Sequence, residues 1–203
     1  MAHPPVTPDG AAELTWEIAE LFPAQGHWSE EEYLALDTNR LVEFSHGKLE
    51  ILEMPTFSHQ RLVALLYRIL SSFVERQQLG VVMFAPLRMR LWQGKYREPD
   101  VLFMSRENAE QLGEKFWHGA DLVMEVVSPD DPRRDWVTKR FEYARAGIPE
   151  YWIVDPTPRT VTVLHLAGEQ YSVHGTFPEG ETATSVLLDG FSVPVSDVFA
   201  EIS

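Results

Sequence analysis

The stretch Asp121-Leu122-Val123-Met124-Glu125-Val126-Val127 is an apolar run with one internal carboxylate, Glu125. Such a run is typical of a central strand that is buried on both faces of a sheet. A lone charge in that setting is unfavourable unless it is paired or bound to a metal ion. The segments on either side of the run indicate which fold surrounds this carboxylate.

After the run, the pattern predicts a helix from Asp135 to Ala146, ended by Gly147, and a buried strand from Tyr151 to Val154. Short strands and turns follow, beginning with residues 161–164. Before the run, Pro99 opens a short strand over residues 100–104. These segments alternate between helical and extended periodicity, which indicates an α/β fold.

Further toward the N-terminus, Ser58 caps a long predicted helix that Gly80 closes. Its apolar stripe consists of Leu62, Leu65, Leu66, Ile69, Leu70 and Phe73. One strand is predicted over residues 81–91, with Leu87, Met89 and Leu91 on one face and Arg88 and Arg90 on the other.

The first elements carry clear local signals. Ser29 and Glu32 form a capping box, which predicts a short helix through about Leu36. Residues 41–53 alternate as two strands about His46-Gly47, which predicts a hairpin. The whole order predicts a mixed α/β sandwich with a largely antiparallel sheet.

We expect a single domain over residues 28–203, preceded by an N-terminal arm over residues 1–27. Helical spacing of Leu14, Ile18, Leu21 and Phe22 predicts a short helix in this arm. The arm either packs on its own body or reaches a second subunit, and we expect a homo-oligomer, most simply a dimer.

Composition narrows the function classes. Seventeen Lys and Arg against 31 Asp and Glu give a formal charge of −14, which disfavours salt-driven nucleic-acid binding by the whole surface. Residues 54–104 alone carry a charge of +4, so a local patch for a polyanion remains open. We expect a cytoplasmic location, because the sequence has no cysteine, no secretory signal and no apolar run long enough to span a membrane.

Glu125 has a potential partner in Asp100, which stands at the start of a neighbouring strand. Two carboxylates on adjacent strands repel each other, and a divalent cation such as Mg²⁺ relieves this repulsion. The alternative is that Glu125 pairs with a nearby Arg or Lys and that Asp100 is only a turn residue. Motifs for dinucleotide or zinc enzymes are absent from the sequence.

Several sequence blocks resemble the Uma-two family. They are Glu98-Pro99-Asp100-Val101, Glu125-Val126-Val127-Ser128-Pro129, Lys139 with Tyr143, and the run from Gly147 to Pro156. This family is similar to the restriction-endonuclease-like, or PD-(D/E)XK, nucleases. The resemblance implies an α/β/α core and Mg²⁺-dependent cleavage of DNA, with Mn²⁺ as an alternative ion.

Carried over residue by residue, the resemblance implies that Asp100, Glu125 and the backbone carbonyl of Val126 hold the metal ion. The usual lysine position falls on Val127, which cannot polarise water. The family pattern implies that Lys139 replaces that lysine from the following helix, where Asp135, Lys139 and Tyr143 share one face. The alternative for Lys139 is an exposed lysine paired with Asp135.

Two further residues complete the expected catalytic set. The resemblance implies that Glu43 supplies a third carboxylate at the metal site, in the role of the superfamily's early glutamate. The alternative is a strand glutamate that faces solvent. His59 begins the long helix and faces the cleft or a phosphate; otherwise it is an ordinary polar residue at a helix start.

The basic central segment supplies the expected phosphate contacts. They are Arg61, Arg88, Arg90, Lys95 and Arg97. The alternative for Arg88 and Arg90 is the solvent-facing side of an edge strand.

The leading hypothesis is therefore a metal-dependent endonuclease acting on DNA. A second hypothesis is a catalytically silent nuclease fold used for binding or assembly, which Val127 and the net charge favour. A metal-independent glycosidase with paired carboxylates is a third reading, weakened by the lack of an aromatic-rich cleft signal.

Overall fold

The central sheet is built around β7 (Leu122–Val126), which lies between β6 (Val101–Ser105) and β8 (Glu150–Asp155), as the apolar run predicts. The computed structural model describes residues 22–38, 40–200 and 202. Residues 1–21, which hold most of the predicted arm and its helix, lie outside the described residues. The arm helix and the dimer therefore stay predictions.

Within the described residues, six strands form the central sheet in the order β10-β9-β8-β7-β6-β3. The outer strands are β3 (Gly80–Phe84), β9 (Thr160–Ala167) and β10 (Gln170–Pro178). The β7–β8 pair is parallel and the other neighbouring pairs are antiparallel, which confirms the predicted mixed, largely antiparallel sheet.

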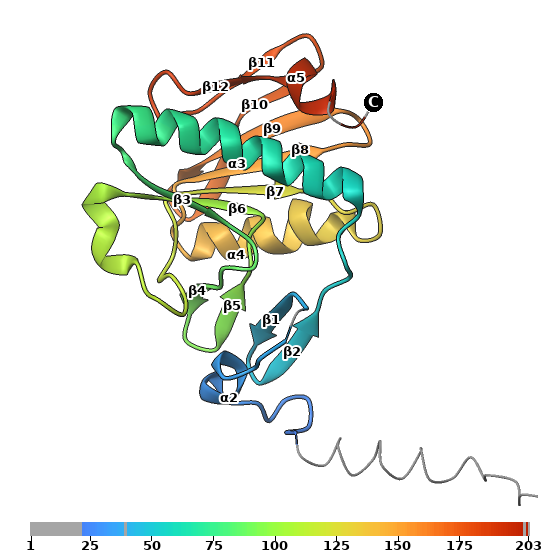
Figure 1. Cartoon of the computed structure of the whole chain (residues 1–203), viewed down its shortest axis with the longest axis vertical. Coiled ribbons are helices and arrows are strands. Elements are labelled where there is room, and N and C mark those ends of the chain that lie inside the picture. Colours follow the sequence, from blue (N-terminus) through green and yellow to red (C-terminus); the bar gives the residue numbers. More distant parts are fainter. Residues whose placement is uncertain (1–21, 39, 201, 203) are drawn as a thin grey trace, which may run out of the picture.

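Helices cover both faces of this sheet, as Figure 1 shows for α3 and α4. The helix α3 (Phe57–Gln77) packs on one face with α5 (Val195–Ala200), β11 (Thr182–Thr184) and β12 (Ser192–Pro194). The other face is covered by the π-helical segment η2 (Arg134–Lys139), which continues into α4 (Arg140–Arg145). The architecture is an α/β/α sandwich.

Strand periodicity decides which way Glu125 faces. Met124 and Val126 pack in the cluster beneath α3, whereas Val123 packs in the cluster beneath α4. Successive side chains alternate between the faces of a strand, so Glu125 lies on the α4 side, together with Val123.

A smaller sheet flanks the sandwich, with the order β2-β1-β5-β4. Its strands are β1 (Val42–Ser45), β2 (Lys48–Ile51), β4 (Met89–Trp92) and β5 (Lys95–Arg97). The predicted hairpin is confirmed, because His46 and Gly47 take φ values of 46° and 81° between β1 and β2. The helix α2 (Glu30–Leu34) carries the predicted capping box.

The single strand predicted over residues 81–91 is wrong. The chain leaves the central sheet after β3, turns at Ala85-Pro86, and enters the smaller sheet as β4. Proline has no backbone N–H for a ladder hydrogen bond, so a central strand does not continue through it. The predicted apolar face is confirmed: Leu87, Met89 and Leu91 belong to one packed cluster.

The predicted ends of α3 also need correction. Thr56, not Ser58, caps the helix, and its hydroxyl accepts a hydrogen bond from the backbone N–H of His59 at 3.2 Å. The helix ends at Gln77, and Gly80 instead begins β3, where an added Cβ would lie 2.0 Å from the carbonyl oxygen of Met104. Gly80 therefore permits close strand packing.

The remaining helical element is a short 3-10 helix, η1 (Arg106–Gln111). The predicted helix over residues 135–146 corresponds to η2 and α4, although its π-helical opening was not expected. Among the described residues, no helix combines the length and the apolar composition needed to cross a bilayer.

Candidate active site

Asp100 and Glu125 lie together where β6 begins and β7 ends. The two strands are antiparallel, with Val101 opposite Met124. The Asp100 carboxylate accepts a hydrogen bond from the backbone N–H of Val126 at 2.8 Å, and the Asp100 N–H points to Glu125 Oε2 at 3.4 Å. These contacts bring both carboxylates to one end of the sheet, as the resemblance implies.

Glu125 is held from the opposite layer by η2 and α4. Lys139 Nζ lies 2.9 Å from Glu125 Oε2, and the Tyr143 hydroxyl donates to Glu125 Oε1 at 2.5 Å. Burial raises the pKa of Glu125, reinforced by the charges of Asp100 and Asp135, although Lys139 and the Tyr143 hydroxyl act in the opposite direction. The carboxylate is thus both buried and rigidly placed.

Lys139 is a buried cation and not the exposed lysine of the alternative reading. Its side chain is 7% exposed, and Nζ also lies 2.9 Å from Asp135 Oδ1. Burial alone would lower the pKa of Lys139, but Glu125 and Asp135 raise it well above its usual range. Glu125 and Asp135 therefore favour the protonated, positively charged form of Lys139. Its π-helical segment is of a type that is frequent at functional sites.

His59 reaches the same point from the first turn of α3. Its Nε2 lies 3.3 Å from Asp100 Oδ2 and 3.2 Å from the carbonyl oxygen of Val126. Burial lowers the pKa of His59, but the hydrogen bond and charge of Asp100 outweigh burial, and the net shift is upward. His59 faces the cleft, as predicted, and contacts two of the oxygens expected to bind metal.

These side chains share one cavity of about 660 Å³. It lies between the loop before α3, the ends of the central strands and the start of η2. Its lining includes His59, Asp100, Glu125, Val126, Arg134 and Lys139. Acidic side chains at Glu53, Asp130 and Asp131 also line it, so the cavity holds more carboxylates than cations.

The model of the family described as "Uma2: Putative restriction endonuclease" matches residues 30–196. This chain belongs to the Uma2 family. The match includes all the cavity residues named above, and it confirms the resemblance drawn from the Glu125–Pro156 block. None of the curated proteins matches the chain.

A solved structure has the same architecture as this Uma2 chain. It is a crystal structure of "a putative nuclease belonging to DUF820" from Anabaena variabilis. The TM-score is 0.71 at 19% sequence identity, and the match covers 86% of this chain and 98% of that chain. At this identity the likeness establishes the fold. The family description supports a nuclease.

In this Uma2 protein, Glu43 does not join the cavity lining. Arg97 and Arg134 both contact its Oε2, and the backbone N–H of Glu98 donates to its Oε1 at 3.2 Å. Burial would raise the pKa of Glu43, but Arg97, Lys139 and Arg134 lower it to about 2. The expected role as a third metal carboxylate does not fit, because arginine side chains already compensate the charge of Glu43. The alternative of exposure to solvent does not fit either, because Glu43 is 0% exposed.

Burial also decides the role of Lys95 and Arg97. Arg97 is 2% exposed and makes two hydrogen bonds to Glu142, at 2.7 and 2.9 Å. Lys95 is 3% exposed and lies 2.8 Å from Glu142 Oε1. Expected phosphate contacts from these two residues do not fit, because their charges are already compensated inside the protein. They join the smaller sheet to α4.

The other predicted phosphate contacts divide into two groups. Arg88 stacks 4.6 Å above the Tyr33 ring and donates to two carbonyl groups of the α2 region. Arg90 lies 3.5 Å from Glu30 Oε2. Both therefore fix α2 to the smaller sheet. Arg61 is exposed on α3 and packs 5.8 Å from the centre of the Phe57 ring, so it stays a predicted phosphate contact.

Arg134 is the functional candidate that the sequence reasoning missed. Its guanidinium is held by Glu43 and Glu50 while its side chain remains 25% exposed and lines the cavity. Its Nε is buried without a hydrogen-bond partner among the described residues. The available signal was the Arg133-Arg134 pair at the start of the helix that carries Lys139.

The donor set suits a hard cation that retains water. Asp100, Glu125 and the Val126 carbonyl supply oxygen atoms, which Mg²⁺ prefers. No three His, Asp or Glu side chains converge as a complete metal cage in the part of the chain that the structure describes. Mg²⁺ does not require such a cage, since it is usually bound by one or two carboxylates together with several waters.

Proposed function

We propose that this Uma2 protein is a metal-dependent endonuclease that hydrolyses phosphodiester bonds of DNA. The observation that carries the proposal is the convergence of Asp100, Glu125 and Lys139 in one cavity, although they come from three different segments. Two carboxylates can hold a metal ion for phosphodiester hydrolysis, and a charged amine beside them can stabilise the negative charge that develops on the phosphate.

Asp100, Glu125 and the carbonyl oxygen of Val126 would hold Mg²⁺, or Mn²⁺ in its place. When bound, such an ion polarises a phosphate oxygen and makes water a stronger nucleophile at neutral pH. The buried, crowded carboxylates favour a cation, because a neighbouring positive charge stabilises their ionised form.

The protein's own cations would act on the phosphate. Lys139 keeps its charge next to Glu125 and stabilises negative charge as it develops. Arg134 offers a planar guanidinium, whose geometry suits phosphate oxygens. His59 Nε2 lies beside Asp100, whose charge favours the protonated ring, and a proton on this nitrogen could be donated to the leaving oxygen. Tyr143 keeps the Glu125 carboxylate in position.

A catalytically silent binding module is the alternative. Its main support was valine at position 127 in place of the usual lysine. The contact between Lys139 and Glu125 weakens that support, because a lysine reaches the carboxylate from another element.

Cleavage of supercoiled plasmid and of end-labelled oligonucleotides, with Mg²⁺, Mn²⁺ or EDTA, tests the proposal. Asp100→Asn and Glu125→Gln remove one charge each, and Asp189→Asn and Glu169→Gln make the same changes on the exposed surface. We expect the first pair to lower turnover by about 100-fold or more and the second pair to leave it unchanged. Equal turnover in all four variants would falsify the proposal.

A further inference from the structure

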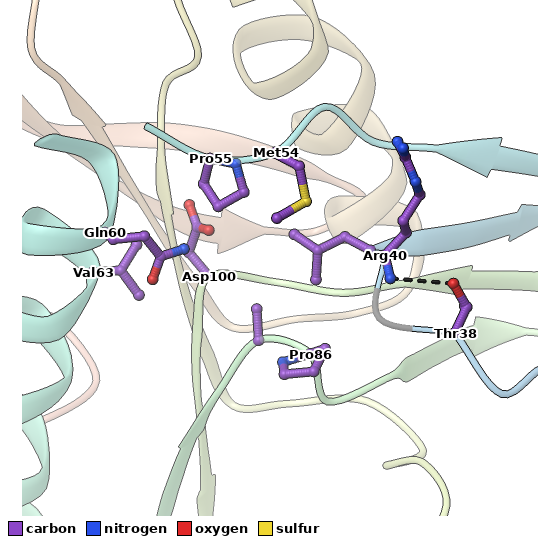
Figure 2. A pocket seen from close by; sticks show the side chains of 10 residues that line it. Thr38, Arg40, Met54, Pro55, Gln60, Val63, Pro86 and Asp100 are labelled. Carbon is purple, nitrogen blue, oxygen red and sulfur yellow. Dashed lines mark hydrogen bonds between the residues drawn. The ribbon is translucent and has the colours of Figure 1, made fainter. Parts of the chain in front are cut away.

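A second, smaller cavity adjoins the first. Its volume is about 240 Å³, and Asp100 lines both cavities (Figure 2). Leu41, Met54 and Pro55 also line both. The two cavities therefore share part of their lining, and the carboxylate of Asp100 lies at their boundary.

The walls of the smaller cavity are mainly apolar. Leu41, Met54, Pro55, Val63, Ala85 and Pro86 contribute most of the lining. Polar groups stand at its ends: Figure 2 shows Gln60 beside Asp100 at one end, and Arg40 beside Thr38 at the other. Apolar walls with a few polar groups are typical of sites for small organic groups.

The shape of the lining suits a flat heterocycle better than a phosphate. Arg40 is the one cation among the lining residues, and Asp100 opposes it. Pro55, from the segment before α3, and Pro86, in the β3–β4 connection, lie on opposite walls, and a planar ring between them can contact both. The Gln60 amide can donate to and accept from the polar edge of such a ring.

We propose that the smaller cavity binds one unstacked base of the substrate, next to the phosphate in the larger cavity. This inference rests on the proposed nuclease function and names the form of DNA that the site accepts. A base enters such a cavity only when it is unpaired or flipped out of the duplex, which requires unstacking. Single-stranded or locally opened DNA is therefore the preferred substrate.

The charge of the protein agrees with this preference. With a formal charge of −14 and with Lys95 and Arg97 buried, the described surface is poorly suited to a long duplex backbone. Apolar contact with a base does not depend on neutralising phosphates, so it can contribute to binding on an acidic protein.

The test uses one single-stranded oligonucleotide whose cleavage position has been mapped, and the same strand in a duplex. Two further strands carry a tetrahydrofuran abasic residue on the 5′ or the 3′ side of the cleaved phosphate. We expect the parent protein to cleave the single strand at least about 10-fold faster than the duplex. We expect the abasic residue on one side to lower kcat/KM by about 10-fold or more.

A variant pair locates the effect in the cavity. Gln60→Phe fills the opening from the first turns of α3, and Gln77→Phe makes the same change at the exposed last residue of that helix, away from both cavities. Gln60→Phe should reduce kcat/KM on the normal strand to the level of the abasic strand and cause no further loss on the abasic strand. Gln77→Phe should match the parent on both strands.

The possible failures are distinguishable. If the parent cleaves DNA but treats the abasic strands and the duplex like the normal strand, the base-binding inference is overturned and the nuclease proposal stands. Equal losses for Gln60→Phe on normal and abasic strands also overturn it, since they reveal a general effect on the fold. If no strand is cleaved with Mg²⁺ or Mn²⁺, both proposals fall.

Discussion

Lys139 Nζ lies 2.9 Å from Glu125 Oε2, although the two residues belong to different layers of the sandwich. In the PD-(D/E)XK pattern that the sequence resembles, the lysine stands two residues after the acidic residue, at the position that Val127 occupies here. The π-helical segment η2 brings a lysine to the same carboxylate from the covering layer. The absence of a lysine at position 127 therefore does not leave Glu125 without a cation.

Replacing Lys139 by methionine should impair both activity and stability. Turnover should fall by about 100- to 1000-fold, because a fixed charge next to the reacting phosphate is lost. Unfolding free energy should fall by about 3–5 kcal/mol, because Glu125 and Asp135 keep buried charges without their partner. Cleavage assays and urea unfolding measure these effects, with exposed Lys115→Met as the control.

The double variant Lys139→Met/Glu125→Gln separates these effects. Removing the unpaired carboxylate should restore part of the lost stability without restoring cleavage. Full cleavage by Lys139→Met alone would show that this amine has no part in the reaction.

Tyr143→Phe removes only the hydroxyl that donates to Glu125 Oε1 at 2.5 Å. We expect the unfolding free energy to fall by about 1.5–3 kcal/mol, the range for a hydrogen bond to a charged group. A positioning role also predicts a lower kcat with little change in KM. Steady-state kinetics decide this: an unchanged kcat in a folded variant would restrict Tyr143 to structural support.

Glu98→Gln should stabilise the protein at high pH and not at low pH. Burial raises the pKa of Glu98 to about 7, although the hydrogen bond from the Val42 N–H and the charge of Arg88 lower it. The pKa of this carboxyl is higher in the folded than in the unfolded protein. Its contribution to the free energy of unfolding is therefore fully present below about pH 4.5 and is lost as the pH rises to about 7. Glutamine does not ionise and keeps an acceptor oxygen for Val42.

Urea unfolding at pH 4.5 and pH 8 measures this difference. The variant should match the parent at the lower pH and exceed it by about 1–3 kcal/mol at the higher pH. Exposed Glu110→Gln should show no such dependence. A constant difference at both pH values would mean that Glu98 does not change its protonation on folding.

Mg²⁺ or Mn²⁺ at millimolar concentration should raise the Tm of the parent by a few degrees, because a ligand that binds only the folded state stabilises it. EDTA should reverse the shift. Asp100→Asn should abolish the shift, whereas the surface variant Asp189→Asn should retain it. Differential scanning calorimetry measures the effect, and an equal shift in both variants would place the ion elsewhere.

Local signals in the sequence predicted much of the framework. The Ser29–Glu32 capping box, the turn at His46-Gly47 and the apolar run of β7 depend on neighbouring residues, so they can be read without the fold. The sequence also predicted that Asp100 and Glu125 lie together, because Asp100 stands at the start of an apolar strand and Glu125 inside another.

The tertiary structure decided what the charged side chains do. Arg97 and Glu43 are far apart in sequence, yet they neutralise each other in a buried network, which removes one expected phosphate contact and one expected metal ligand. Arg134 reaches the cavity through that same network. Periodicity shows which residues form a strand or helix, but ion pairs depend on which elements meet, and that depends on packing of the whole chain.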